Sequence, residues 1–149
     1  MSLAAIRGSI VTVLSSVPGI GTVHAYERWA ADWTAYLSFF KTEENKINGW
    51  TVSRRKTESD RDTMPTLNRR HRFIMRGYYG LKDSAATEHT FQALVEAVQD
   101  AFEDQYLLNG TVINSGPVQV QVFENRMFGN VLCHYAELEL IAEERVTYS

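Results

Sequence analysis

The sequence has 149 residues, which is the size of one ordinary domain and enough to bury a hydrophobic core. Hydrophobic residues make up 44% of it and charged residues 22%, as in soluble globular proteins. The net charge is −3, and no apolar run approaches the roughly 20 residues that cross a bilayer, which excludes a membrane-spanning helix. The single cysteine, Cys133, excludes an internal disulfide and is typical of a reducing compartment.

The N-terminal region predicts an amphipathic helix over about residues 2–17, with Ser2 as a candidate N-cap and Pro18 ending it. Its apolar residues recur at helical spacing. They are Leu3, Ile6, Ile10, Val13, Leu14 and Val17. A secretory signal would begin with basic residues, which are missing here, and residues 7–9 interrupt the apolar stretch. We therefore expect a helix of the mature protein.

The next segment predicts a strand over residues 22–29, which alternate loosely and are rich in β-formers. A short aromatic helix follows, because Trp33, Tyr36, Leu37 and Phe40 recur at helical spacing. We interpret these side chains as core, the alternative being an aromatic cage for a ligand.

Two strands, over residues 47–55 and 69–81, flank a polar segment at residues 56–68. In the second strand Phe73 and Met75 lie on the face opposite Ile74 and Tyr78. Pro65 cannot donate to a strand ladder, so the polar segment predicts either an extended, mobile loop or the tip of a long hairpin. Residues 54–72 are therefore expected to project as an arm.

The clearest helical pattern runs over residues 84–104, and the rest of the chain is expected to pack around it. Ser84 is a candidate N-cap, and one stripe is apolar, made of Phe91, Leu94, Val95, Val98 and Phe102. The opposite face is polar and carries no basic residue. A helix with one apolar stripe has to pack it against another layer, and the flanking period-two segments predict a sheet.

Two further strands are predicted, over residues 118–122 and 131–142, joined by a hairpin connection at 124–130. The predicted fold is therefore a single α+β domain, residues 1–149, with a mainly antiparallel sheet, helices packed on one face and a projecting polar arm or hairpin. Phe91, Leu94, Val98 and Phe102 are expected to pack against Val118, Val120, Leu132, Leu138 and Leu140.

Charge is distributed unevenly along the chain. Residues 54–72 hold seven basic residues against three acidic ones, a balance of +4. From residue 83 to the end there are eleven acidic residues and two basic ones, a balance of −9. Such a chain can complement a copy of itself, although the same pattern also arises as solvated surface.

No motif predicts catalysis. The four histidines lack metal-ligand spacing with one another or with Cys133, and the Gly19–Gly21 stretch is too short for a dinucleotide loop. His134 is expected to be buried or at an interface. The carboxylates Glu58, Asp60 and Asp62 could bind a divalent ion, but the neighbouring arginines favour internal pairing. We therefore expect no catalytic, metal or cofactor-binding residue and no enzyme activity.

Two other classes of function stay open. Basic residues of the arm lie close in sequence to Trp50, Phe73, Tyr78 and Tyr79, a composition typical of a single-strand nucleic-acid binding face. The chain as a whole is acidic, with a pI of about 5.8, which argues against that interpretation. A small enzyme or ligand-binding α+β domain, with a site formed only in three dimensions, is the other alternative.

The order and texture of the elements resemble the tail-terminator or tail-completion proteins of long-tailed bacteriophages. The likeness covers most of the chain. It lies in LAAIRGSIVTVLSS, VHAYERWAADWTAYLSFF, INGWTVSRR and RRHRFIMRGYYGLKDS, followed by the acidic helix and the closing strands. The resemblance implies a structural virion protein of the tail, assembled in the host cytoplasm as a ring, expected to be a hexamer. Such a ring stops tail-tube polymerisation, docks the head-side connector and passes DNA without binding it specifically.

The charge pattern then predicts two surfaces. Arginines of the arm are expected to meet carboxylates of an adjacent copy, namely Arg54, Arg55, Arg61, Arg69, Arg70 and Arg72. The acidic helix face, with Glu96, Asp100 and Glu103, is expected to line the DNA channel, because a basic wall would retain phosphate.

Overall fold

The described part of the chain, residues 2–42 and 46–148 of the computed structural model, contains three α-helices and one six-stranded sheet. The helices are α1 (Leu3–Ser15), α2 (Trp33–Ser38) and α3 (Thr87–Asp104). The strands are β1 (Thr22–His24), β2 (Asn48–Thr63), β3 (Thr66–Gly80), β4 (Asn114–Ser115), β5 (Gln119–Phe128) and β6 (Val131–Thr147). Short 3-10 turns at Asp83–Ala85 and Leu108–Gly110 flank α3. None of the described helices has the length and apolar character that crossing a membrane requires.

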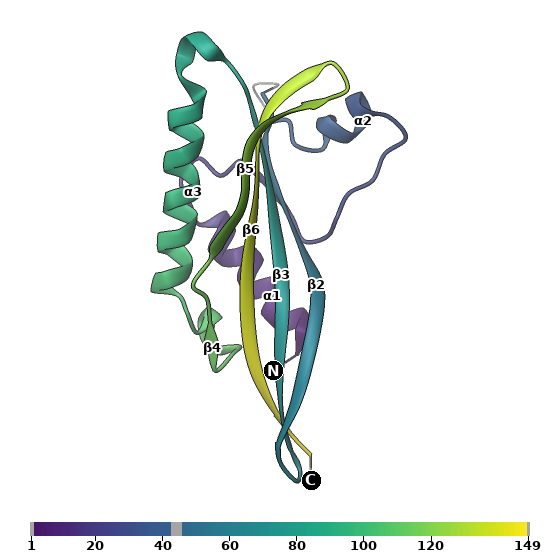
Figure 1. The fold of residues 1–149 in the computed structure, drawn as a ribbon, viewed down its shortest axis with the longest axis vertical. Helices are drawn as coiled ribbons and strands as arrows, with labels where there is room; N and C mark the ends of the chain where they lie inside the picture. Colours follow the sequence, from purple (N-terminus) through teal and green to yellow (C-terminus); the bar gives the residue numbers. More distant parts are fainter. Residues whose placement is uncertain (1, 43–45, 149) are drawn as a thin grey trace.

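The sheet order is β1-β2-β3-β6-β4, and β5 also pairs with β6. Only β1 runs parallel to its neighbour, β2, while every other described pair is antiparallel. Figure 1 shows the sheet nearly edge-on, with the long strands β2, β3 and β6 running from the top of the molecule to the bottom. The predicted α+β class with a mainly antiparallel sheet is confirmed.

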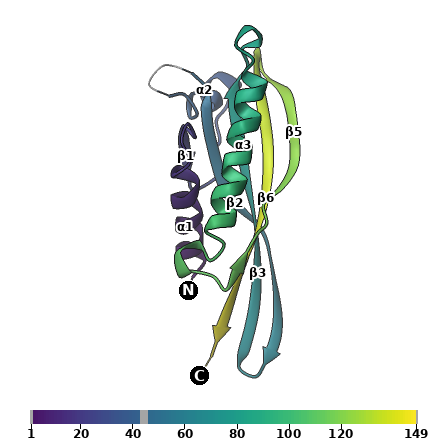
Figure 2. The same cartoon turned by 90° about the vertical axis from the view of Figure 1, so that its left-hand side faces the viewer.

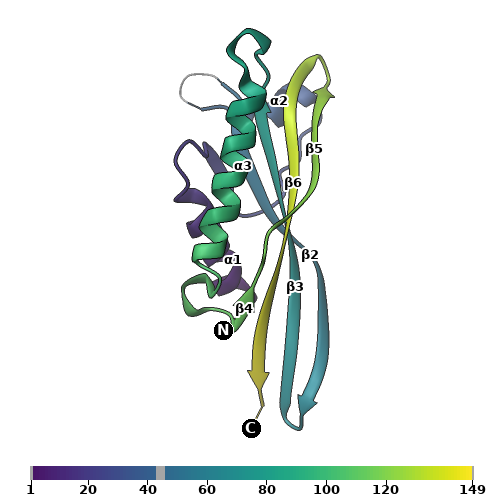
Figure 3. The same cartoon turned by 60° about the vertical axis from the view of Figure 1, so that its left-hand side comes forward.

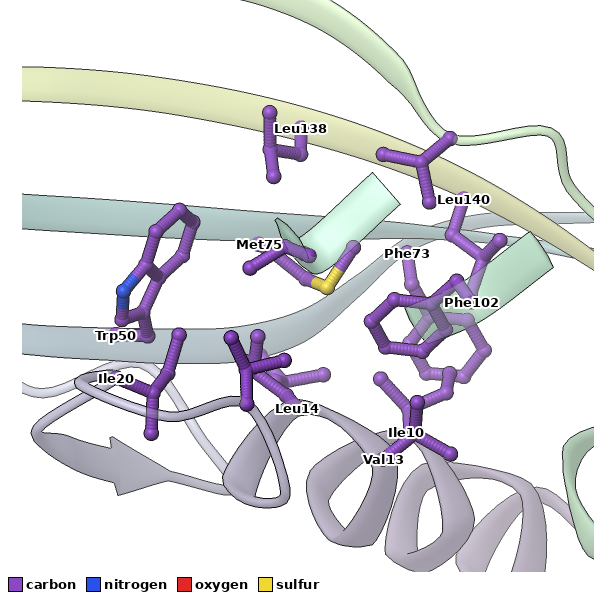
Figure 4. Packing of buried hydrophobic residues seen from close by; sticks show 14 of the residues in the cluster. Ile10, Val13, Leu14, Ile20, Trp50, Phe73, Met75, Phe102, Leu138 and Leu140 are labelled. Carbon is purple, nitrogen blue, oxygen red and sulfur yellow. The ribbon is translucent and has the colours of Figure 1, made fainter. Parts of the chain in front are cut away.

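Helices α1 and α3 cover one face of the sheet (Figures 1 and 2). Ser2 caps α1 as predicted, since its Oγ accepts a hydrogen bond from Ala5 N at 3.1 Å. Odd-numbered residues of β3 face these helices, because side chains alternate along a strand. The core of this face is shown in Figure 4, where the helices meet β2, β3 and β6. It includes Ile10, Leu14, Trp50, Phe73, Met75, Phe102, Leu138 and Leu140.

Gly77 makes room for the largest side chain of this core. It pairs across the strands with Trp50, which is completely buried. A Cβ atom at position 77 would lie only 2.6 Å from the indole ring. The strand therefore needs a residue without a side chain here, because the Trp50 ring occupies the space above Gly77.

The other face of the sheet carries a second, aromatic cluster. It consists of Leu37, Phe40, Tyr78, Phe128, Cys133 and Tyr135. Helix α2 covers this face, on the opposite side of the sheet from α1 and α3 (Figure 1). The prediction that the helices pack on one face is therefore wrong for α2. Leu37 and Phe40 are core, as predicted, while Trp33 is 49% exposed. Even-numbered β3 residues such as Tyr78 supply enough apolar surface for the short helix to pack there.

The end of the first strand and the start of α3 differ from the sequence prediction. The first predicted strand ends at His24 instead of residue 29. Ser84 does not cap α3, because it lies in the 3-10 turn and the cap position is Ala86, with a left-handed φ of 51°. Thr87 fixes the helix start instead, since its Oγ1 accepts from Lys82 N at 2.9 Å. A side-chain contact across the loop replaces the predicted local cap.

The predicted core partners of α3 are confirmed except at two positions. Phe91, Leu94, Val98 and Phe102 share one buried cluster with Val118, Leu138 and Leu140. Val120 and Leu132 are instead 40% and 41% exposed. An irregularity in the β5–β6 register between Val120 and Val122 breaks the simple alternation of faces. Leu132 pairs with the exposed Met127 near the end of the hairpin.

Truncating the centre of the α3 contact should destabilise the whole domain. Phe102 is 2% exposed, so Phe102→Ala should lower the free energy of unfolding by about 3–5 kcal/mol. The exposed neighbour gives a matched control, since Glu103→Ala should change it by less than about 0.5 kcal/mol. Urea unfolding measures both, and equal stability of the two variants would contradict the packing role of α3.

Candidate functional site: the projecting arm

The arm, residues 54–72, is a hairpin made of the distal parts of β2 and β3. It extends beyond α1 and α3 at one end of the molecule, as Figure 3 shows. Residues 56–68 were expected as a mobile loop or a hairpin tip, and the hairpin is what the structure has, with strands up to Thr63 and from Thr66. The end of β6 supplies a third strand, because Thr66–Arg72 pairs with Ile141–Thr147. Three paired strands explain why so polar a segment forms regular structure.

One face of the arm carries a ladder of charges that pair within the chain. Lys56 Nζ lies 3.1 Å from Glu58 Oε1, and Arg70 forms an ion pair with Asp60 and lies 4.0 Å from Glu58. The hydrogen bond and charge of Lys56 lower the pKa of Glu58, and Asp60 raises the pKa of Arg70. Such exposed pairs, within β2 or across to β3, each stabilise a hairpin by only about 0–1 kcal/mol. Together they favour the observed register in a strand pair that has no apolar face.

The other face has a buried polar cluster where the arm joins the body. His71 Nε2 lies 2.9 Å from Glu144 Oε1, and His71 Nδ1 lies 2.8 Å from Thr57 Oγ1. The His71 and Glu144 side chains are 4% and 3% exposed. Arg69 Nη1 lies 4.0 Å from the same carboxylate oxygen. This cluster joins β2, β3 and β6 at the base of the arm, so the arm and the body share one buried network.

The structure separates the six predicted interface arginines into two sets. Arg69, Arg70 and Arg72 each have a carboxylate partner in their own chain, namely Glu144, Asp60 and, at 3.5 Å, Glu139.

Arg54, Arg55 and Arg61 have no carboxylate partner among residues 2–42 and 46–148. Arg54 donates to Thr57 Oγ1 at 3.3 Å, and Arg61 lies 3.1 Å from the sulfur of Met64. This second set is exposed and therefore free to meet an outside anion.

The predicted acidic surface lies apart from the arm. Glu96, Asp100 and Glu103 are all exposed on the outer side of α3, away from the sheet. The apolar stripe of the helix faces the core, so the sequence correctly assigned the two sides of the helix. The helix and the arm occupy different parts of the molecule in all three views, and the two predicted surfaces can therefore act independently.

The residues considered as metal ligands or catalytic groups form other contacts or are buried in the structure. Glu58 and Asp60 pair with arm cations, as predicted, and the described residues contain no group of three or more His, Cys, Asp or Glu placed to hold a metal ion. Cys133 is buried, and burial raises the pKa of its thiol to about 11, which disfavours the thiolate. His134 is buried as expected, between Asn125 Oδ1 at 2.6 Å and Thr87 Oγ1 at 2.8 Å.

Sequence reasoning missed the carboxylates that hold the arm. Glu139 lies inside the predicted last strand, but its pairing with Arg72 was not foreseen. Glu144 lies beyond the predicted end at residue 142, because the strand extends to Thr147. The alternation Ala142, Glu144, Val146 continues the core-facing side of that strand, but a glutamate at the middle position conceals it. The sequence alone does not identify Glu144 as buried, because its partner His71 lies on another strand.

Removing one member of the buried pair should destabilise the protein strongly. Glu144→Ala leaves His71 buried without its partner, so we expect a loss of about 3–5 kcal/mol in the free energy of unfolding. Glu143 lies next to it on the opposite face, and Glu143→Ala should cost less than about 1 kcal/mol. Chemical denaturation of both variants measures the difference. A small loss for Glu144→Ala would mean that the pair does not anchor the arm.

Acid should weaken the fold partly through His134. Burial lowers its pKa, and Glu88 only partly offsets this effect. The unfolded chain, with a histidine pKa of about 6.5, therefore takes up the proton at a higher pH than the folded chain does. The stabilisation is complete above about pH 6.5 and is lost as the pH falls through the folded pKa. His134→Gln should lose less stability than the wild type between pH 7 and pH 5, and parallel losses would exclude this role.

Comparison with known proteins gives no family from which a function could be inferred. A scan of the sequence against protein-family models finds no matching family. A search of curated proteins finds no match either. The shape of the subunit, its arm and its exposed charges are therefore the grounds on which a function can be assigned.

Proposed function

We propose that the protein is a structural subunit of a long-tailed bacteriophage tail, where copies form a ring that ends tail-tube polymerisation. The ring, expected to be a hexamer, docks the head-side connector on one side and the tail-tube protein on the other. DNA passes through its channel. Assembly takes place in the host cytoplasm and the final location is the virion.

The observation that carries this proposal is the arm. A three-stranded projection at one end of an elongated subunit makes its two ends unlike (Figure 3). Contacts between unlike surfaces of identical subunits are heterologous, and such contacts close into rings when the rotation fits. The arm keeps Arg54, Arg55 and Arg61 without carboxylate partners among the described residues, which supports a contact with acidic surface on another copy.

The same charges give less support to the nucleic-acid alternative. Arg69, Arg70 and Arg72 are neutralised by carboxylates of their own chain, so the arm is not a continuous basic surface. Binding of single strands depends on such a surface, because released counterions supply much of the affinity. The exposed acidic side of α3 instead supports the proposal that this helix forms the channel wall, because acidic side chains do not bind the phosphates of passing DNA.

Charge reversal on the unpaired arginines tests the ring. Arg54→Glu with Arg61→Glu should raise the concentration needed for ring formation at least about tenfold, which corresponds to about 1.4 kcal/mol. Lys41→Glu with Lys82→Glu reverses two exposed cations outside the arm and should leave assembly unchanged. Light scattering after gel filtration and negative-stain microscopy measure assembly, and urea unfolding checks that both variants are folded. A wild type that stays monomeric, or an arm variant that assembles normally, would contradict the proposal.

The channel surface has its own test. Glu96→Lys with Asp100→Lys should leave the ring intact and make it retain DNA, because lysines bind phosphate. Cosedimentation with duplex DNA at low and at 0.15 M salt measures retention, since screening beyond about 8 Å at the higher salt should reduce it. Unchanged retention would mean that α3 does not line the channel.

A further inference from the structure

The two most exposed large apolar side chains of the described residues lie at opposite ends of the molecule. Met64, at the tip of the arm, is 80% exposed, and Trp29, in the segment before α2, is 78% exposed. Figures 1 and 3 place the arm tip at the bottom and α2 near the top. Isolated apolar residues on a surface are common, but each of these two belongs to a larger apolar feature.

Trp29 lies at the mouth of a cavity of about 590 Å³ between the segment before α2 and the sheet. Part of its lining is aromatic and includes Trp33, Tyr36, Tyr78, Phe128 and Tyr135. The rest is charged, with Glu27, Arg28, Asp32, Arg76, Arg126 and Glu137. The rings are held in place, since the Tyr36 and Tyr78 hydroxyls lie 2.6 Å apart and the Arg126 guanidinium lies 4.3 Å from the centre of the Tyr135 ring. Cavities of roughly 300–1,000 Å³ take small ligands or inserted side chains.

The arm ends in an apolar knob that is equally well fixed. Met64 and Pro65 form the turn, and Tyr148, which is 49% exposed, lies beside them because its N–H donates to Pro65 O at 3.2 Å. Arg69 donates to the Tyr148 hydroxyl at 2.7 Å. A charged arm with an apolar end is suited to insertion, because its sides stay in water while its tip gains from burial.

We infer that the tip of the arm of one copy inserts Met64 and Pro65 into this aromatic cavity of the next copy. A thioether packs favourably against aromatic rings, and aromatic side chains also line the grooves that bind proline-rich peptides. Both surfaces carry charges of both signs. Arg61 and Asp62 flank the tip, and the cavity is lined by three acidic and three basic side chains, so neither tip charge meets a wall of its own sign alone. The cavity is lined by Arg76 and Tyr78, which lie far along the extended strand that starts beside the tip at Thr66. The tip and the cavity of one molecule therefore cannot meet, and the contact is between copies.

This inference rests on the association of copies proposed above and specifies where they meet. The arm tip and this cavity are different surfaces of the subunit, so the contact is head-to-tail. If the rotation closes, the long subunits form the sides of a ring. If it does not close, they form an open filament.

Disulfide trapping between two different variants tests the contact. Thr63→Cys places a thiol beside Met64, and Ala31→Cys places one at the cavity wall, and both positions are exposed. The native Cys133 is buried and gives a low background. Mixed under oxidising conditions, the two proteins should form a covalent heterodimer at least about ten times faster than Thr63→Cys mixed with Ser84→Cys, because docking raises the local thiol concentration. Adding Met64→Asp to the Thr63→Cys protein should abolish the effect, whereas adding Met127→Asp, at an exposed methionine outside the cavity, should not.

The outcomes separate this contact from the proposed ring. A heterodimer no faster than the control pair, or Thr63→Cys proteins that cross-link only with each other, would overturn the inference. If rings nevertheless form, and also form with Met64→Asp, the proposed ring is retained and only the contact between tip and cavity is wrong. Rapid heterodimer formation in a protein that gives open chains and no rings supports the contact and overturns the ring. An arm tip that stays unreactive while a small aromatic compound saturates the cavity would show a ligand site instead.

Discussion

The pairing of β3 with β6 is the constraint on which the rest of the molecule depends. It involves all 15 residues of β3, from Thr66 opposite Thr147 to Gly80 opposite Cys133. A shift of one residue would turn Phe73 and Met75 away from α1 and α3 and would expose the core. The same ladder continues without a break into the arm. The register that the core requires therefore also places the ion pairs of the arm and the buried His71–Glu144 pair.

Local periodicity was sufficient to predict the sheet and the layer that α1 and α3 form on it, but not the face on which α2 packs. The apolar stripes of α1 and α3, and the alternation in β3 and β6, are properties of single segments, and a sequence displays them directly. The arm was ambiguous because its strands have no apolar face, so only the pairing partner distinguishes a strand from a loop there. That partner, the end of β6, lies 69 to 81 residues further along the chain, from Arg72 opposite Ile141 to Thr66 opposite Thr147. The aromatic cavity was hidden for the same reason, since four separate segments build it.

The charges show how a pattern along the sequence changes its meaning in three dimensions. A balance of +4 over residues 54–72 suggested a basic arm. In the folded chain, Glu139 and Glu144 come from the acidic half and meet Arg72 and Arg69 within one molecule. Part of the asymmetry is thus used for folding. What is left for a partner is the smaller set of arginines that found no carboxylate among the described residues, together with an acidic helix face that no other element covers.

The continuity of the strands also determines how the arm would carry a mechanical load. Because β3 runs from the tip into the core without a hinge, a pull on the tip along the strands loads its hydrogen bonds to β6 in shear. Bonds loaded in this way yield together, whereas bonds at the end of a peeled hairpin yield one at a time. The buried Glu144 ties the third strand to the hairpin at the point where the arm leaves the body. The arm is therefore mechanically continuous with the core. A force applied at its tip is transmitted through β3 to the residues that pack against α1 and α3.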